Sequence, residues 1–293
     1  MKFKNIYLFG VLFSGLFTVL STGCGLWDDK MVEPHTIIVP SFNLTTYEDE
    51  GTDSNNIAEV WVYSETDVLG VFPLPATIPV LQENGEDVVH ITLLPGVRVN
   101  GISSTRKPYP FYEVLELDFN YVPGGVDTVE FHSNYVSGVD VVLAENFESA
   151  NRFQASSTST AEVVRTFDPA WVYEGAVSGL IMLSEDASHV TSTTQEQLYD
   201  LTGDVATFLE FNYRCDNSFA VGMEAIGGIN PERTPIIVLN PTGEEWNKMY
   251  LDLGPFLRST PTAYGYELTL DAILDMGEKS GYVVVDNFKI VHY

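Results

Sequence analysis

The chain closes on the stretch YVVVDNFKIVHY, which spans Tyr282 to Tyr293. Valine, isoleucine, phenylalanine and tyrosine dominate it, and neither glycine nor proline interrupts it. β-Branched and aromatic residues at this density are typical of a strand. The preceding EKSG, at Glu278–Gly281, has the composition of a hairpin turn, so we expect the last two strands of the chain to be joined there.

Runs of the same kind precede this strand as far back as residue 139. Each is short, rich in β-branched and aromatic residues, and bounded by turn-forming residues, as expected of strands. They are VLAENFESANRF, AVSGLIMLS, TFLEFNYRC, SFAVGMEAIG, TPIIVLN, WNKMYLDLG and AYGYELTLDAIL. The Ser/Thr-rich RFQASSTSTAEVV at 152–164 predicts an exposed loop, and TTQEQLYDLTG at 193–203 is a weak helical candidate. The sequence therefore predicts an all-β unit over residues 139–293.

Residues 34–138 show the same pattern and form a first predicted unit. Its expected strands lie in HTIIVPSF, AEVWVYS, VLGVFPL, DVVHITLL, FYEVLELDFNYV and DTVEFHSNYV, with turn signals at sandwich-like spacing. Pro73, Pro75 and Pro79 cannot donate backbone hydrogen bonds, so we expect that piece at a sheet edge or in a connection. The predicted fold class is all-β, with two consecutive units.

The second unit resembles the galactose-binding-like jelly rolls found in many carbohydrate-binding modules. The resemblance rests on the opening ENFES, the central YEGAVSGLIML and the closing VVVDNFKIV, where such modules often end in IDNI. The first unit is similar to the small immunoglobulin-like modules of surface lipoproteins, through VWVYSETDVLGVFPLPATIPVL at 60–81. Together these resemblances imply an N-terminal immunoglobulin-like β-sandwich followed by a C-terminal jelly-roll β-sandwich.

The first 23 residues have the layout of a secretory signal peptide. Two lysines precede an apolar run from Ile6 to Leu20, and small residues lead into Cys24. The run is shorter than the about 20 residues of a membrane span. This arrangement resembles a bacterial lipobox, which implies that Cys24 is lipidated and begins the mature chain, with 24–33 as a tether. The alternative is an ordinary signal peptide whose cleavage leaves a free thiol.

Acidic residues follow the cysteine in GLWDDK, which resembles the surface-export signal of lipoproteins from the Bacteroidota. The chain as a whole looks like two-domain surface lipoproteins of that group. The resemblance implies an outer-membrane location, lipid-anchored and facing the cell surface. DTV at Asp127–Val129 also matches the short O-glycosylation pattern of that group, with Thr128 as acceptor, but a three-residue match is commonly chance.

Charge and composition exclude several functional classes. Acidic residues outnumber basic ones by 41 to 14, giving a net charge of −27. A surface this negative repels phosphates and argues against nucleic-acid binding. The five histidines fall in separate segments, and no nucleophile elbow or phosphate loop is present, so we expect neither catalysis nor a required cofactor. Cys215, alone in a predicted strand, has the character of a small buried hydrophobe.

GVRVNGISSTRKPYPFYEV, at 96–114, combines cations, aromatics and stiffening prolines. In so acidic a chain, such a loop is a candidate contact for an acidic partner surface, because Arg and Tyr dominate interface energetics. The candidate partner-binding residues are Arg98, Arg106, Lys107, Tyr109, Phe111 and Tyr112. The alternative is that the aromatics cap the open end of the sandwich core and the cations pair with neighbouring acids.

Two further candidate sites lie in the second unit. DPAWVYEG, at 168–175, predicts a loop whose Trp171 and Tyr173, with Glu174 beside them, could stack on a sugar ring; core packing of Trp171 is the alternative. Jelly rolls of the resembled type often hold a structural calcium ion between the first and last strands. The resemblance therefore implies a calcium site at three carboxylates, Glu145, Glu148 and Asp286.

The sequence favours one function and leaves a second open as the alternative. The favoured function is a non-catalytic accessory or scaffold subunit of an outer-membrane protein assembly for transport, export or barrel assembly. The second is a glycan-binding lipoprotein of a polysaccharide-capture system that uses the jelly roll. Exposed aromatics clustered on residues 141–293 would favour the sugar, and a basic-aromatic patch on residues 98–112 would favour a protein partner.

Overall fold

The structure is a computed structural model that describes residues 33–47, 49–65, 67–82, 87–198, 201–227 and 233–293. Cys24, the predicted signal peptide and nearly all of the predicted tether lie outside these ranges. The described residues form five β-sheets, with one short helix among them. The prediction of an all-β chain is confirmed.

In the first unit two layers of strands enclose a hydrophobic core that includes Ile37, Val60, Ile78 and Leu93. One layer contains β5 (Ala76–Val80), β1 (His35–Val39) and β9 (Val126–Thr128), continued by the pair β2 (Phe42–Leu44) and β10 (Phe131–Ser133). The other contains β4 (Val68–Pro73), β3 (Glu59–Ser64), β6 (Val88–Arg98), β7 (Arg106–Pro108) and β8 (Leu115–Asn120). The unit is a two-layer β-sandwich, and its narrower assignment as immunoglobulin-like stays a prediction.

The prolines lie where a missing backbone donor is tolerated. Pro79 sits in β5, which pairs with β1 on one side only, and Pro75 lies in the connection between β4 and β5. An edge strand needs hydrogen bonds on one side only, so a residue without an N–H group fits there. The predicted edge-or-connection role of this segment agrees with its place in the sheet.

The second unit consists of a six-stranded and a five-stranded sheet. The six-stranded sheet has the order β13 (Val164–Thr166), β14 (Ser178–Ser184), β21 (Ser280–His292), β16 (Thr207–Cys215) and β19 (Asn247–Asp252), with β11 (Asp140–Glu145) also paired to β21. The five-stranded sheet has the order β12 (Phe153–Ala155), β15 (His189–Thr194), β20 (Gly265–Ile273), β17 (Phe219–Ile226) and β18 (Arg233–Leu239).

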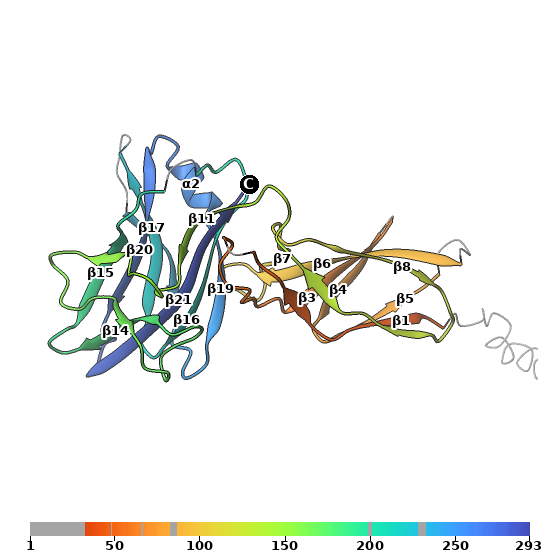
Figure 1. Cartoon of the computed structure of the whole chain (residues 1–293), viewed down its shortest axis with the longest axis horizontal. Coiled ribbons are helices and arrows are strands. Elements are labelled where there is room, and N and C mark those ends of the chain that lie inside the picture. The colour runs from red at the N-terminus through yellow and green to blue at the C-terminus, as the bar shows by residue number, and fades with distance from the viewer. Residues whose placement is uncertain (1–32, 48, 66, 83–86, 199–200, 228–232) are drawn as a thin grey trace, which may run out of the picture.

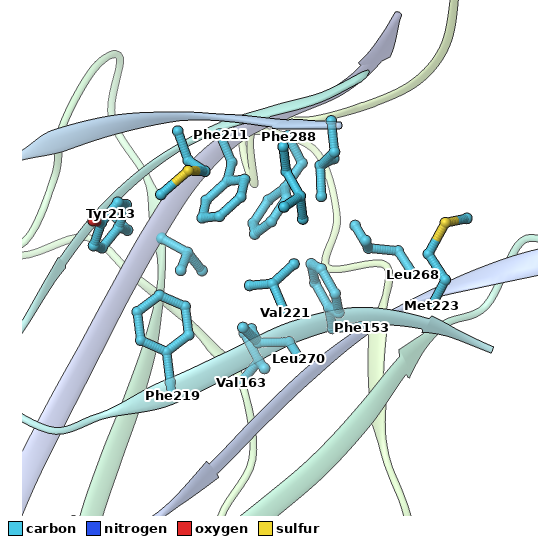
Figure 2. Packing of buried hydrophobic residues seen from close by; sticks show 14 of the residues in the cluster. Phe153, Val163, Phe211, Tyr213, Phe219, Val221, Met223, Leu268, Leu270 and Phe288 are labelled. Carbon is cyan, nitrogen blue, oxygen red and sulfur yellow. The ribbon is translucent and has the colours of Figure 1, made fainter. Parts of the chain in front are cut away.

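The facing sides of these two sheets form the larger hydrophobic core (Figure 2). Phe211 from β16 and Phe288 from β21 stack with ring centroids 5.0 Å apart, and Phe153 packs edge-on against Phe288. Cys215 is fully buried in this cluster, and burial raises the pKa of its thiol to about 11. A thiol in this setting is not a nucleophile at neutral pH, which agrees with its expected structural role.

A β-bulge in β21 shifts which side chains of the strand face the core. Val285 and Phe288 both belong to the core, although strict alternation would place them on opposite faces. Asn287 between them has a φ of 55°, and the pairing register with β16 shifts at the same place. Asparagine tolerates this left-handed conformation better than most residues. The bulge places Lys289 and Val291 on the outer face of the sheet, toward the first unit.

One helix was missed by the sequence analysis. α2 (Gly254–Ser259) has a proline in its first turn and no side-chain hydrogen bond at its N-cap, and Phe256 and Leu257 join the core. The expected turn at 193–203 lies partly outside the described residues, and Thr193 and Thr194 belong to β15 instead. None of the helices in the described ranges is long and apolar enough to cross a membrane.

The two units lie end to end, and the first unit meets the outer face of the six-stranded sheet beside β19 (Figure 1). Val99 forms a parallel bridge to Tyr250, and Asn100 binds both Tyr250 and Asp252. Three residues of the second unit, namely Phe208, Tyr250 and Val291, belong to the core of the first. This junction, called the seam below, is therefore packed like a protein interior.

Candidate functional site

The aromatic residues of the predicted partner-binding loop lie inside the seam. Tyr109, Phe111 and Tyr112 are 2%, 0% and 2% exposed. The Tyr109 ring packs edge-on against Phe208 at 5.5 Å and Tyr250 at 4.9 Å. The prediction that these three rings contact an outside partner is wrong, because the second unit of the same chain covers them. Burial against that unit removes their apolar surface from water without any partner.

The cations of this loop remain at the rim of the seam. Arg106 pairs with Glu59 at 3.3 Å, and Lys107 lies 3.9 Å from Asp252 of the second unit. Arg98 is exposed beside them at the end of β6. For Arg106 and Lys107, the alternative to contact with a partner was pairing with neighbouring acidic residues, and the structure shows this pairing. The pair of Lys107 and Asp252 is at the surface and adds only about 0–1 kcal/mol, whereas Glu59 in the other pair is 3% exposed.

A buried ionic cluster lies at the centre of the seam and was not predicted. Glu210 from β16 is fully buried, and its carboxylate is 2.9 Å from Nζ of Lys248, which is also buried. Tyr109 and Tyr135 of the first unit donate hydrogen bonds to Glu210 at 2.5 and 3.1 Å. Lys289 from β21 lies close enough to stabilise the same carboxylate electrostatically. The two units are thus joined by charge as well as by apolar packing.

The cluster holds Glu210 ionised. Burial alone would raise the pKa of Glu210, but attraction to Lys248 and Lys289 and the hydrogen bond from Tyr109 outweigh it, and the pKa is lowered. Burial lowers the pKa of Lys289 to about 8, and attraction to Glu210 opposes that change. The free energy of unfolding therefore depends on the carboxylate and the ammonium groups staying together.

Strand alternation conceals this cluster in the sequence. Glu210 falls between Leu209 and Phe211, so a strand with one solvent-exposed face fully accounts for a glutamate at this position. The usable signal is the single lysine inside each of two apolar runs, Lys248 in WNKMYLDLG and Lys289 in NFKIVHY. A lysine so placed needs a counter-charge if both faces of the strand are covered, but the sequence does not say that they are.

The predicted sugar-stacking residues lie on the same outer face, beyond the seam. Trp171 packs edge-on against Tyr282 with centroids 4.6 Å apart, and Tyr173 lies 5.0 Å from Trp246. Cζ of the Arg214 guanidinium lies 5.0 Å from the ring centroid of Trp171, 5.5 Å from that of Trp246 and 5.8 Å from that of Tyr282. These four aromatic residues, the aromatic cluster, belong to neither hydrophobic core. Core packing, the alternative for Trp171, is therefore not what the structure shows.

The loop that carries Trp171 is fixed to the sheet by hydrogen bonds. The Asp168 carboxylate accepts a bond from the backbone N–H of Ala170 at 3.0 Å, and the Trp171 N–H donates to the Asp168 carbonyl at 2.8 Å. Arg214, on β16, donates to the Ala170 carbonyl at 2.6 Å. The same arginine thus contacts the rings and holds the loop, which gives the aromatic cluster a defined geometry.

Tyr173 and Glu174 connect the aromatic cluster to the seam. The backbone N–H of Tyr173 donates to Ser178, whose hydroxyl donates to Asp286 at 2.6 Å. Burial raises the pKa of Asp286 to about 7, although the hydrogen bonds that it accepts oppose the rise. Glu174 accepts bonds from Asn287 at 3.1 Å and from the Thr52 hydroxyl of the first unit.

A cavity of about 290 Å³ opens at this point between the two units. We call it the seam cavity. Its walls carry carboxylates, amides and a hydroxyl, and both units contribute to them. The lining residues are Gly51, Thr52, Asn146, Glu148, Glu174, Gly175 and Asn287.

The three carboxylates of the implied calcium site are not brought together. Glu145 accepts bonds from the backbone N–H groups of Phe147 at 2.6 Å and Arg152 at 2.8 Å, while Glu148 accepts two from residues 176–177. Asp286 binds Ser178 and its own neighbour in the chain. Across the described ranges, no group of three or more His, Cys, Asp or Glu side chains is arranged to hold a metal ion. These carboxylates fix loops instead.

Comparison with known proteins gives structural similarity only. No family model and no curated protein sequence matches the chain. Among solved structures, a xylan-binding domain of carbohydrate-binding module family 22 is 14% identical with a TM-score of 0.36, covering 51% of this chain and 93% of its own. A family 61 module in complex with β-1,4-galactotriose is 13% identical with a TM-score of 0.36, covering 52% and 97%.

A further similar structure is a carbohydrate-binding module from the β-sandwich superfamily with promiscuous specificity. It is 14% identical with a TM-score of 0.36, and the match covers 79% of this chain and 84% of that one. The cleaved adhesin domain K3 of Lys-gingipain from Porphyromonas gingivalis is 13% identical with a TM-score of 0.36, covering 53% and 99%. These values describe distant similarity between β-sandwiches.

Proposed function

We propose that the chain is a non-catalytic glycan-binding protein and that the aromatic cluster of the second unit contacts the sugar. The observation that carries this proposal is the gathering of Trp171, Trp246 and Tyr282 around Arg214, with Tyr173 packed against Trp246, outside both cores. Aromatic rings at a surface bind the CH faces of sugar rings well, while polar groups at their edges bind hydroxyls.

The cluster has the rigidity that binding requires. Arg214 and Tyr282 stand on neighbouring strands of one sheet, and Trp246 directly precedes β19. The Tyr282 hydroxyl donates to the carbonyl of Gly243 at 3.0 Å, which ties the loop before β19 to β21. A ligand therefore meets rings that are already oriented, and little conformational entropy is lost on binding.

The role that the sequence favoured, an accessory subunit of an outer-membrane assembly, has lost its main support. Its predicted contact surface depended on exposed aromatics at residues 109–112, and those rings are buried in the seam. Lipid attachment at Cys24 and display at the outer membrane remain part of the proposal. Under this proposal the aromatic cluster faces the outside of the cell, where polysaccharides are found.

The proposal is tested by titrating the purified full-length chain with soluble xylan, β-1,4-galactan, glucomannan and polygalacturonate in a calorimeter. Trp171→Ala should weaken binding about tenfold, which corresponds to about 1.4 kcal/mol. Tyr264→Ala is the matched control, because Tyr264 is a 76% exposed aromatic outside the cluster. Wild-type chain that binds none of the four polymers, or a Trp171→Ala chain that binds as wild type does, would refute the proposal.

A further inference from the structure

A loop of the first unit, residues 51–56, reaches the proposed sugar site. The Ser54 hydroxyl lies 3.1 Å from the hydroxyl of Tyr173 and donates to Asn212 of β16 at 3.0 Å. The hydroxyl of Thr52 donates to the carboxylate of Glu174. Two consecutive residues of the sugar-site loop are therefore held by side chains from the other unit.

The loop is itself anchored by the buried ionic cluster. Lys248 donates to the carbonyl of Ser54 at 2.7 Å, and Lys289 donates to the carbonyl of Thr52. Tyr250 accepts a bond from the backbone N–H of Asn56 at 3.0 Å. These anchors come from β19 and β21, the strands that also frame the aromatic cluster. A loop fixed at three points can position the side chains that touch it.

We infer that the ligand site is shared between the two units. Thr52 and Ser54 are positioning residues that hold Glu174 and Tyr173, and the seam cavity beside them takes one uncharged sugar unit of a bound glycan. This inference rests on the proposed function, since it assigns partners and a substrate class to the same site. It predicts that the second unit needs the first for full affinity.

The chemistry of the seam cavity indicates the substrate class. Among the described contacts, Oε2 of Glu148 and Oε1 of Glu174 accept no hydrogen bond, although the other oxygen of each carboxylate does. Free carboxylate oxygens beside the amides of Asn146 and Asn287 suit the hydroxyls of a neutral sugar. No cation is among the lining residues, so a carboxylated or sulfated sugar would be repelled.

Calorimetric titration of full-length variants with the neutral polymer that the wild type binds best tests this inference. Ser54→Ala and Thr52→Ala should each weaken binding at least fivefold, while Ser54→Thr, which keeps the hydroxyl, should restore most of the affinity. Thr77→Ala is the matched control, since Thr77 is an exposed residue of β5 in the same unit. Thermal unfolding of each variant shows whether a loss of affinity reflects a loss of fold.

A second measurement has a readout that a structural role would not change. Glu174→Gln removes one negative charge from the cavity and keeps the side-chain shape. The ratio of the affinity for the neutral polymer to the affinity for polygalacturonate should fall at least threefold. Glu130→Gln, at an exposed residue, is the control and should leave this ratio unchanged. An unchanged preference would refute the assigned substrate class.

The outcomes separate this inference from the proposed function. Loss of binding in Trp171→Ala, Ser54→Ala and Thr52→Ala, with Thr77→Ala unaffected, supports both. Loss in Trp171→Ala alone overturns the shared site and leaves the proposed function standing. Wild-type chain that binds no polymer, or Trp171→Ala binding normally, overturns the proposed function and the inference together.

Discussion

Replacing Glu210 with glutamine removes the negative charge at the centre of the seam and almost no volume. In the wild type the carboxylate faces Nζ of Lys248 at 2.9 Å and accepts bonds from Tyr109 and Tyr135. Glutamine keeps one oxygen that can accept from a tyrosine. Glutamine removes the counter-charge of Lys248 and leaves Lys289 with only the weaker attraction of Glu50 and Glu174, so the expected effect is electrostatic.

The burial of the two lysines sets the size of the loss. Removing one partner of a buried ion pair typically costs about 3–5 kcal/mol. The variant can avoid part of that cost by releasing the proton of Lys289, because burial already lowers the pKa of this lysine to about 8 and one pKa unit corresponds to only about 1.4 kcal/mol. We therefore expect a loss near the lower end of the range, about 3 kcal/mol in the free energy of unfolding at pH 7.

The same reasoning predicts the pH dependence of the deficit. As the pH rises through about 8 the wild type also loses the Lys289 proton. Below that pH the folded wild type binds more protons than the folded variant, so the difference in stability between the two should shrink as the pH rises from 7 to 9. Urea unfolding at pH 7 and pH 9 measures this. Glu130→Gln is the control, because Glu130 is 77% exposed and pairs only with His132 in the described contacts. A loss below about 1 kcal/mol, or one that is equal at both pH values, contradicts the reasoning.

Two further expectations concern other carboxylates. The folded-state pKa of Asp286 is raised from 3.8 to about 7, so the folded chain binds more protons than the unfolded chain between these values, and stability falls as the pH rises through that window. Asp286→Asn should remove this decline and unfold at a higher temperature than wild type above pH 7; a lower temperature there contradicts the assignment. Because Glu145 and Glu148 are bound by backbone N–H groups, EDTA should leave the unfolding temperature unchanged. A fall on adding EDTA would revive the calcium prediction.

The strands were predictable because burial in a sandwich follows the alternation of the backbone. Leu209, Phe211 and Tyr213 all join the core, as their spacing indicates. The bulge at Asn287 was not predicted, although the sequence carries a signal for it: strict alternation from Val283 and Val285 would turn Asn287 and Lys289 toward the core. Helix α2 was missed for a different reason. It spans six residues and has no capping side chain, so it lacks the periodic signal that identifies longer helices.

The candidate sites show what residue type can and cannot predict. Trp171 and Tyr173 were singled out because Asp168 and Pro169 predict a loop there, with core packing of Trp171 as the alternative; in the structure both residues lie outside the two hydrophobic cores. Tyr109 and Tyr112 have the same composition signal, yet they are buried, because the surface that covers them comes from residues about 100 positions later. Local sequence indicates which side chains can make a contact, whereas the docking of the units decides which contact they make.

The charges at the seam favour one docking geometry rather than high stability. A buried ion pair contributes little more than an apolar contact of equal volume, but a displaced one leaves an unpaired charge that costs about 3–5 kcal/mol. An apolar seam could slide by a few ångströms at small cost. Here the two units must meet so that Tyr109 reaches Glu210 and the loop 51–56 lies over Lys248 and Lys289. Because that loop also bonds to the residues beside Trp171, the pairing that fixes the angle between the units fixes the geometry of the proposed sugar site as well.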